Sequence, residues 1–358
     1  MDLVCSDCGS TYPADGPWRC SCGHALDFAD QPSPDGGPPE AMDRSAGLWD
    51  FEAFLPVERR VSLGEGWTPL VDAPAWDAQF KLEYVFPTGS FKDRGATTTL
   101  SRALALGADR VLEDSSGNAG LAVATYAARA DLDAEIFVPA DAKPGKLRAI
   151  ERTGATLRPV EGSRQAVTDA CVAAVEDGDA HYASHAWDPA FLAGTATVAF
   201  EIAAQRDWTA PDAVLTPLGH GTLFLGAYRG FDALYRTGWI DSMPRLLGAQ
   251  AAGVAPVVDA LGGSPGSERN AAADGIQITD PVRLDQVLDA IDATDGDALA
   301  VGAEATRREH DRLAQAGFHV EPTCATATAA LAAFRDRGVL APEDDVVVAL
   351  TGSGLKGE

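Results

Sequence analysis

Apolar, strand-like runs alternate with alanine-rich helical stretches from about residue 80 to the end of the chain. Such alternation is typical of parallel sheets covered by helices, because parallel strands need long crossover connections. We therefore predict an α/β protein whose ligands bind where strands end and glycine-rich turns lead into helices. The expected strands are 81–86, 110–114, 134–139, 155–160, 212–217, 245–250 and 345–351. The clearest expected helices are 95–108, 118–130 and 222–237.

The first 26 residues follow another pattern. The stretch "CSDCGSTYPADGPWRCSCG" contains Cys-x2-Cys and then Cys-x-Cys, with a glycine after each pair. Tight turns of this kind direct four thiolates at one tetrahedral Zn2+, which predicts a zinc-ribbon-like extension over 1–26. His24 is an alternative ligand, and four thiols without metal is the other interpretation. A site closed by four thiolates has no open position for catalysis. The expected ligands are Cys5, Cys8, Cys20 and Cys22.

Residues 27–45 are rich in proline, glycine and aspartate and predict a linker. The chain has 358 residues, which suits two α/β domains better than one small core. Its N-terminus lacks the basic and apolar regions of a signal peptide, and no apolar run approaches the roughly 20 residues of a membrane span. We expect a soluble cytoplasmic protein.

The net charge is −25, from 53 Asp and Glu against 28 Lys and Arg. A high-salt cytosol explains this, because salt screens the self-repulsion of an acidic surface. An acidic protein from a high-GC genome is the alternative. In either case the surface repels nucleic acid and anionic membranes, so we expect neither as a partner.

Lysine is scarce, yet Lys92 lies in a turn of small residues, "PTGSFKDRG", at 87–95. Further turns with small residues at helix starts lie at 114–120 and 217–223, and a fourth glycine-rich turn ends the chain at 350–358. Free backbone N–H groups at a helix start bind anions. Several such turns around one lysine indicate a phosphorylated cofactor held covalently. A lysine Schiff base is the route used by pyridoxal phosphate (PLP).

Several motifs resemble the threonine synthase family, within the fold-type-II, tryptophan-synthase-β-like group of PLP enzymes. The motifs besides the cysteine pairs are "GLWDFEAFLPV" (47–57), "LGEGWTPL" (63–70), "KLEYVFPTGSFKDRG" (81–95), "SSGNAG" (115–120), "EPTCATATAAL" (321–331) and "LTGSGLK" (350–356). The resemblance implies a large PLP-binding domain over 46–94 and 201–358, a small domain over 95–200, and PLP between them.

The resemblance also implies residue roles. Lys92 would hold PLP as the internal aldimine and then remove the substrate α-proton. Asp93 and Arg94 are expected to be structural partners, for instance as an ion pair, rather than catalysts. The implied cofactor-binding residues are Lys92, Asn118 at the 3′-oxygen, Gly219, His220, Gly221 and Thr222 at the phosphate, and Thr351 at the pyridine nitrogen. The residues implied at the substrate carboxylate are Ser115, Ser116, Gly117 and Ala119.

The stretch "WDPAFLAGTAT" at 187–197 departs from the family pattern. In the threonine synthase family the corresponding stretch reads approximately Asn-Pro-x-Arg-x-Glu-Gly-x-Lys-Thr. The resemblance implies that this region helps to hold the phosphate of O-phosphohomoserine. Losing a guanidinium and an ammonium weakens the binding of a dianion strongly. Arg152, Arg158 or Arg164 are candidates for the missing charge. The residues that replace asparagine, arginine, glutamate and lysine are Asp188, Phe191, Ala193 and Ala196.

Three functional hypotheses follow. The first is threonine synthase, which makes threonine and phosphate from O-phosphohomoserine. The second is a threonine-synthase-like serine/threonine dehydratase or a cysteine-synthase-like β-replacement enzyme with a non-phosphorylated substrate. The third, a non-enzyme that retains the fold, is least favoured because Lys92 and Asn118 are intact. A homodimer is a possible assembly. Among the histidines without metal spacing, His185 is the strongest candidate for a role, and Cys171 and Cys324 are expected in the core.

Overall fold

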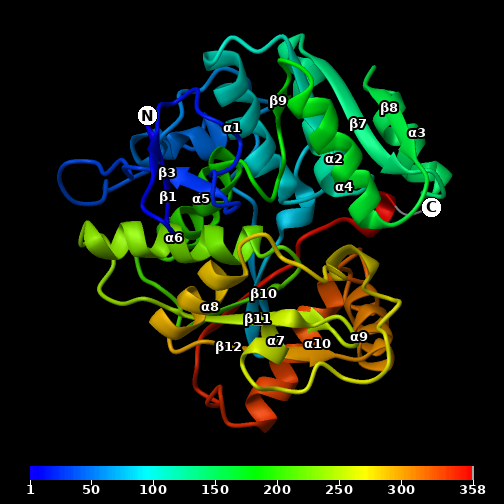
Figure 1. Cartoon of the computed structure of the whole chain (residues 1–358). Helices are drawn as coiled ribbons and strands as arrows, with labels where there is room; N and C mark the ends of the chain where they lie inside the picture. The colour runs from blue at the N-terminus through cyan, green and yellow to red at the C-terminus, as the bar shows by residue number, and fades with distance from the viewer. Residues whose placement is uncertain (357–358) are drawn as a thin grey trace.

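The computed structural model describes residues 1–356, and its larger sheet has six strands in the order β12-β11-β10-β13-β5-β4 (Figure 1). All neighbouring pairs in this sheet are parallel except β4 and β5. β10 and β13 are buried at every position, as expected of central strands covered on both faces. The strands are β4 (Leu70–Ala73), β5 (Ala78–Lys81), β10 (Ala213–Pro217), β11 (Arg245–Ala251), β12 (Asp297–Val301) and β13 (Val346–Ala349).

A parallel four-stranded sheet in the order β8-β7-β6-β9 forms the other half of the molecule. Its helices α2 and α4 are seen beside β7 in Figure 1. The strands are β6 (Arg110–Glu113), β7 (Asp133–Pro139), β8 (Thr156–Val160) and β9 (His181–Tyr182). The helices in this part of the chain are α1 (Lys92–Ala105), α2 (Asn118–Ala130), α3 (Pro144–Glu151) and α4 (Arg164–Glu176).

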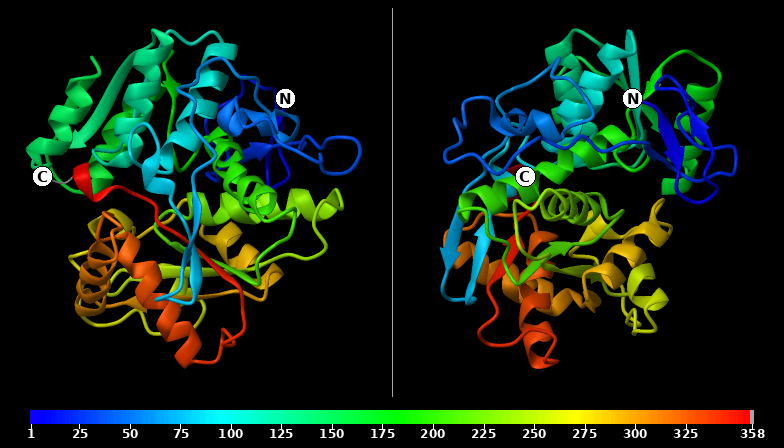
Figure 2. Two further views of the ribbon diagram at one scale, coloured as in Figure 1. Left: turned by 180° about the vertical axis from the view of Figure 1, so that it is seen from behind. Right: turned by 90° about the vertical axis from the view of Figure 1, so that its left-hand side faces the viewer.

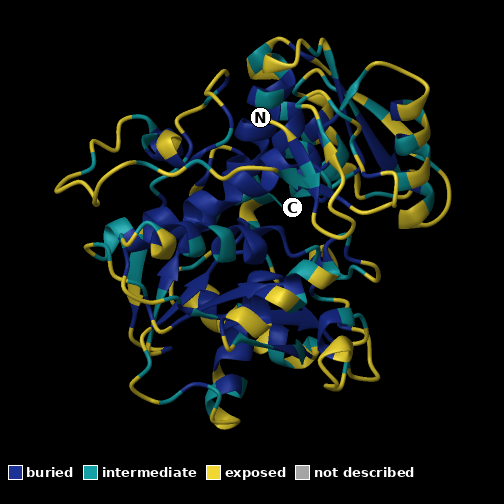
Figure 3. Ribbon diagram, turned by 60° about the vertical axis from the view of Figure 1, so that its left-hand side comes forward, coloured by how far each residue is buried: buried dark blue, intermediate teal, exposed yellow. Residues whose placement is uncertain are grey.

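Helices α5 (Pro189–Gln205) and α6 (Thr222–Arg236) lie between the two sheets (Figure 2). Figure 3 shows this central layer and the central strands of the larger sheet as largely buried. Close packing depends on two glycines, because a Cβ at Gly194 would overlap the backbone of α1 and one at Gly226 would overlap α5. The remaining α-helices are α7 (Pro256–Ala260), α8 (Leu284–Ala293), α9 (Ala303–Gln315) and α10 (Cys324–Asp336).

A small antiparallel sheet at the N-terminus contacts both halves of the molecule. Asp27 on its strand β3 forms ion pairs with Arg229 and Arg283, which belong to the larger half. Trp18 packs edge-on against Tyr182 and Trp187 beside the four-stranded sheet. The three strands, in the order β2-β1-β3, are β1 (Leu3–Cys5), β2 (Thr11–Tyr12) and β3 (Leu26–Phe28), so β3 extends two residues into the predicted linker.

The α/β class and the parallel sheets are confirmed, and one expected strand is wrong. The strand expected at 81–86 is Ala78–Lys81, followed by a 3-10 helix, η2 (Glu83–Val85). The chain turns there because both Lys81 and Glu83 direct their charged groups into a buried cluster of ion pairs. Another 3-10 helix, η1, spans Gly47–Phe54. Within residues 1–356, no helix is both long and apolar enough to cross a membrane.

Candidate active site

Lys92 is the first residue of α1, and its amine points to the start of α6. Its Nζ lies 3.3 Å from Thr222 Oγ1. The rings of Phe91 and Phe191 flank the amine, with centroids 4.7 Å and 5.5 Å away. Burial lowers the pKa of Lys92 to about 7, although the nearby carboxyl of Glu113 acts in the opposite direction. A large fraction of this amine is therefore unprotonated at neutral pH and can act as a nucleophile.

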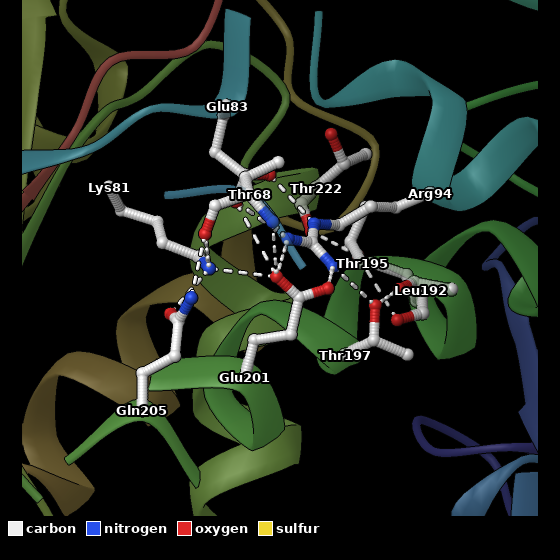
Figure 4. Close-up of polar contacts among 11 residues, drawn as sticks. Thr68, Lys81, Glu83, Arg94, Leu192, Thr195, Thr197, Glu201, Gln205 and Thr222 are labelled. Atoms are coloured by element: carbon white, nitrogen blue, oxygen red, sulfur yellow. Dashed lines mark hydrogen bonds and ion pairs between the residues drawn. The ribbon is translucent and has the colours of Figure 1, made fainter. Parts of the chain in front are cut away.

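A buried ion-pair network fixes the first turn of α1 (Figure 4). Arg94 Nε donates to Glu83 Oε2 at 2.7 Å, and its Nη1 donates to Glu201 Oε1 at 2.6 Å. Lys81 Nζ lies 2.7 Å from Glu201 Oε2. All four side chains are completely buried. Because Arg94 lies two residues after Lys92, the network holds the lysine-bearing turn in place. We call Lys81, Glu83, Arg94 and Glu201 the Arg94 network.

Asp93 and Arg94 both make structural contacts, but they are not each other's partners. The Asp93 carboxylate accepts from the backbone N–H of Thr88 at 2.9 Å and from the Thr88 hydroxyl. Tyr126 also reaches Asp93, with its OH 3.5 Å from Oδ2. Burial raises the pKa of Asp93 to about 7. The suggested ion pair between the two is therefore replaced by contacts of Arg94 with two glutamates.

The turn at 219–222 leads into α6 with free backbone donors. Gly221 adopts φ 82°, a left-handed conformation that favours glycine. Within residues 1–356, the backbone N–H groups of Gly219, His220 and Gly221 make no hydrogen bond. Donors of this kind at a helix N-terminus suit a phosphate group. Thr222 follows, with its hydroxyl at the amine of Lys92.

The turn at 114–117 leads into α2, which begins at Asn118. The backbone N–H of Gly117 donates to Ser115 Oγ at 3.2 Å. Asn118 Nδ2 donates to both carboxylate oxygens of Glu321 at 3.0 Å, and Lys356 Nζ donates to Asn118 Oδ1 at 2.6 Å. The amide of Asn118 is thus connected to the terminal turn. Sequence reasoning did not single out Glu321 or Lys356.

The terminal turn also lies against the turn that carries Lys92. The backbone N–H of Phe91 donates to the carbonyl of Thr351 at 3.1 Å. The Thr351 hydroxyl lies 3.5 Å from Cys324 Sγ, and both residues are buried. The fold therefore brings together the four turns expected from the sequence. Cys324 and Cys171 are buried, as expected.

The divergent stretch at 187–197 forms the start of α5 and supplies no cation. Asp188 caps the helix by accepting from the backbone N–H of Ala190 at 2.8 Å, and it forms ion pairs with Arg102 and His181. Phe191 is fully buried beside the amine of Lys92. A Cβ at Gly95 would overlap its ring, so Phe191 also serves helix packing. Ala193 and Ala196 are buried as well.

Of the three arginines considered as replacements, one reaches the site. Arg164 forms an ion pair with Asp114, with Nη2 3.1 Å from Oδ2, beside the turn that leads into α2. Arg158 is exposed and pairs with Glu135. Arg152 is exposed at the end of α3. The guanidinium of Arg164 is thus already engaged by an acid.

A second group of buried ionisable side chains lies around Lys92. Glu113, at the carboxyl end of β6, is 0% exposed, and its Oε1 lies 2.8 Å from His185 Nδ1. The rings of His185 and His220 are 5.2 Å apart. Glu113 Oε2 and His220 Nδ1 are buried without a partner in the part of the chain that the structure describes. We call Glu113, His185 and His220 the Glu113 cluster. Its signal in the sequence was an acid at the end of a strand, directly before a glycine-containing turn.

The pKa values in the Glu113 cluster reflect burial. Burial, reinforced by Asp114, raises the pKa of Glu113 well above its usual range. Burial and the positive charge of Lys92 lower the pKa of His185 well below its usual range. The same causes lower the pKa of His220 to about 3. Uncharged forms of these three side chains are therefore favoured.

The four N-terminal cysteines lie together, as their spacing predicts. The four Sγ atoms are all within 4.8 Å of one another. Cys5 Sγ is 3.5 Å from Cys22 Sγ, and Cys8 Sγ is 3.4 Å from Cys20 Sγ. His24 belongs to a neighbouring group with Asp7 and Cys22. The thiols are free and suitably placed for one tetrahedral metal ion.

Comparisons with known proteins identify the family of this chain. The family model described as "Pyridoxal-phosphate dependent enzyme" matches residues 61–352. Threonine synthase of Methanocaldococcus jannaschii is 32% identical, over 98% of this chain and 92% of that protein. Threonine synthase of Methanosarcina acetivorans is 34% identical, over 99% of this chain and 92% of that protein. The crystal structure of a threonine deaminase from T.th. has a TM-score of 0.67 and 27% identity, covering 80% of this chain and 92% of that chain.

Proposed function

Because this chain belongs to the family of pyridoxal-phosphate-dependent enzymes, we propose that it acts as a threonine synthase through a Schiff base between Lys92 and PLP. The substrate would be O-phosphohomoserine and the products threonine and phosphate. The observation that carries the proposal is the amine of Lys92, with its pKa lowered to about 7, at the N-terminus of α6. The names of the two archaeal relatives support the choice of reaction.

The residues around Lys92 fit the cofactor. Its phosphate would accept hydrogen bonds from the free N–H groups of Gly219, His220 and Gly221, with Thr222 beside them, and its aldehyde would meet the nearby amine. When bound, PLP supplies an electron sink that weakens bonds at the substrate Cα. Lys92, once freed from the cofactor, would take the Cα proton. Thr351 would face the pyridine nitrogen.

The remaining contacts would orient the substrate. The turn at Ser115, Ser116, Gly117 and Ala119 would hold the carboxylate through its backbone and hydroxyl donors. Asn118 would bind the 3′-oxygen of PLP with the amide nitrogen that now donates to Glu321. In this arrangement the cofactor lies between the proposed domains, 46–94 with 201–358 on one side and 95–200 on the other.

A dehydratase or β-replacement enzyme with a non-phosphorylated substrate is the second candidate. The observation that favours it is the start of α5, where Phe191, Ala193 and Ala196 are buried and carry no charge. A phosphate dianion placed near this surface would lose its hydration without gaining a cation. A hydroxyl or ester group has a smaller desolvation cost. The fold shared with a threonine deaminase is compatible with this candidate.

Absorbance and product analysis test the proposal. We expect the wild-type protein, supplied with PLP in high salt, to show the visible absorbance of the lysine–cofactor bond. Lys92→Ala should lose it completely. O-phosphohomoserine, threonine, serine and O-acetylserine are then offered in turn, and phosphate, keto acid and new amino acids are assayed. Phosphate with threonine supports the first candidate, and keto acid from threonine alone supports the second. A wild type without the absorbance contradicts both.

The N-terminal cysteines are proposed to hold a structural Zn2+. Their Sγ atoms lie within 4.8 Å of one another, and none of them is among the residues proposed to bind the substrate. Full-length protein should contain about one equivalent of zinc, as a single tetrahedral site requires. The double variant Cys5→Ser/Cys8→Ser should contain none. Equal metal content in the two proteins would rule the site out.

A further inference from the structure

We propose that His185 is an acid–base residue of this site and that Glu113 is its positioning residue. The pair would exchange a proton with the oxygen atom on the substrate Cβ. This inference rests on the proposed PLP-dependent function but applies to both candidate reactions. A threonine synthase forms a Cβ–OH bond, and a serine or threonine dehydratase breaks one. Either reaction needs a proton acceptor or donor at that oxygen besides the Lys92 amine at Cα.

The placement of the pair supports this role. β6 and β9 are neighbouring parallel strands, so Glu113 and His185 meet at the edge of the sheet where ligands bind in α/β folds. The Phe191 ring lies 5.5 Å from the amine of Lys92 and 6.1 Å from the ring of His185. His185 retains 7% exposure. His185 Nε2 has no hydrogen-bond partner within residues 1–356.

The charges around the pair determine its proton state. Lys92 from α1, His220 from the turn before α6, and Arg164 from α4 face His185. Glu113 additionally faces Asp114. Burial favours the state in which the pair carries no net charge, since Glu113 resists ionisation and His185 resists protonation.

The number of protons on the pair determines whether His185 Nε2 is a proton donor or a proton acceptor. In the uncharged state the Glu113 hydroxyl donates to His185 Nδ1, and Nε2 carries a hydrogen. When the pair loses one proton, Nδ1–H donates to the Glu113 carboxylate, and Nε2 presents a lone pair. The 2.8 Å hydrogen bond persists in both states. The pair can therefore give a proton at Nε2 and take it back without moving.

The proposed proton transfer at the Cβ oxygen balances in both reactions. In dehydration, Lys92 takes the Cα proton, the Cβ–O bond breaks, and the oxygen keeps its electron pair. That oxygen takes the proton of His185 Nε2 and leaves as water. Synthesis begins differently: the Cα and Cβ protons are removed, the Cγ–O bond breaks, phosphate keeps its electron pair, and one of the two protons is returned to Cγ. The water O–H bond then breaks, its proton passes to the lone pair of His185 Nε2, the oxygen bonds to Cβ, and Lys92 returns the other proton to Cα.

Kinetics of three variants test the role. His185→Gln should lower kcat by about 10²- to 10⁴-fold, as removing a general acid–base group does, with KM within about three-fold. Glu113→Gln keeps a hydrogen-bond partner for Nδ1 but cannot exchange the proton. It should remove one limb of the pH profile of kcat. His181→Gln is the matched control, because His181, on the strand β9 that leads to His185, pairs with Asp188 at 2.7 Å. It should change kcat by less than about three-fold and leave the profile unchanged.

Spectroscopy gives a readout that does not depend on turnover. All variants should keep the absorbance of the lysine–cofactor bond. In the PLP-loaded protein with 15N-labelled histidine rings, the six histidine rings each give signals from two nitrogens, which are assigned by substitution. Glu113→Gln should shift the His185 ring signals and their titration, whereas His181→Gln should not.

The outcomes separate this inference from the proposed function. An active wild type whose kcat and pH profile survive His185→Gln would contradict this inference alone. Ring signals of His185 that do not respond to Glu113→Gln would also overturn it. A wild type that binds no PLP and converts none of the four amino acids overturns both proposals.

Discussion

Two groups of buried ionisable side chains lie close to Lys92, and they differ in how completely they are paired. In the Arg94 network, two cations meet two carboxylates at 2.6–2.7 Å. In the Glu113 cluster, Glu113 Oε2, His220 Nδ1 and His185 Nε2 have no partner within residues 1–356. Glu201 and Glu113 are both 0% exposed, yet the pKa of Glu201 is lowered to about 2 while that of Glu113 is raised. Burial raises both, and only Glu201 has cations close enough to reverse the effect.

The comparison teaches that pairing, rather than burial, distinguishes a structural charge from a reactive one. A fully paired network has one favoured protonation state and holds one geometry. A group whose pKa is shifted towards neutrality and whose atoms lack partners can still bind or transfer protons. Lys92 stands between the two: Arg94 fixes its turn, and its own amine resembles the Glu113 cluster in having a pKa shifted towards neutrality.

The largest expected effect on stability comes from Arg94→Met. The change leaves Glu83 without a cation and Glu201 with only Lys81, so buried carboxylates lose their compensation. We expect the free energy of unfolding to fall by about 3–5 kcal/mol, measured by urea denaturation. Arg158→Met is the control, since that exposed ion pair with Glu135 should contribute only about 0–1 kcal/mol. Similar losses in the two variants would contradict the assignment of Arg94 as a structural residue.

The sequence predicted the parts of this comparison that depend on local pattern. The turns at 87–95, 114–120 and 217–223 were found because glycine and small residues mark a strand-to-helix connection. The alternation of runs also predicted the parallel sheets. β12 was missed because its five residues, "DALAV", include two alanines and an aspartate, which are depleted in strands. The strand expected at 81–86 was placed too far along the chain, because apolar residues continue beyond Lys81 into a 3-10 helix.

The pairings within both groups of buried charges could not be predicted from a single sequence. Arg94 and Glu201 are 107 positions apart, and Glu113 and His185 are 72 apart. In its local sequence, each of these residues resembles an ordinary charged or polar position of an amphipathic helix or strand. Only the packing of α1 on α5, and of β6 on β9, brings the partners together. The resemblance implied the role of Lys92 because that role belongs to a contiguous motif.

The pH dependence of stability offers an intermediate test of the comparison. The pKa of Lys92 falls from 10.5 to about 7 on folding, so the buried amine destabilises the folded protein by an amount that is negligible above about pH 10.5 and grows as pH falls towards 7. In cofactor-free protein, the stability gained by Lys92→Met should therefore be about 2 kcal/mol larger at about pH 7 than at about pH 9. Urea denaturation at the two pH values measures this difference. Lys143→Met, at an exposed lysine, should show none.

The contribution of Glu201 to stability has the opposite sign from that of Lys92 and changes over a different pH range. Its pKa is lowered from 4.5 to about 2, so its contribution is present above about pH 4.5 and lost as pH falls towards 2. Glu201→Gln should therefore destabilise the protein at neutral pH and differ less from wild type at about pH 3. If the difference instead grew as pH fell, the carboxylate would not be the paired form. The two windows do not overlap, so each group can be tested separately.

The smallest expected effect on stability comes from two threonine variants, one beside the Arg94 network and one beside the amine of Lys92. Thr197 Oγ1 accepts from Arg94 Nη1 at 2.9 Å and donates to the carbonyl of Gly194 at 2.6 Å. Thr197→Val keeps the shape and removes both hydrogen bonds, while Arg94 retains its two glutamates. We expect a loss of about 1–2 kcal/mol in the free energy of unfolding and an unchanged lysine–cofactor absorbance.

Thr222→Val makes the matching change on the other side of Lys92. Its hydroxyl lies 3.3 Å from the amine, in the turn proposed to hold the cofactor phosphate. This variant should change the free energy of unfolding by less than Thr197→Val does, because a contact at 3.3 Å is weaker than the two shorter bonds of Thr197. Its affinity for PLP, measured by titrating the visible absorbance, should fall. If Thr197→Val instead lowered PLP affinity and Thr222→Val lowered stability, then the Arg94 network would be part of the cofactor site, and the division between paired and unpaired charges would not hold.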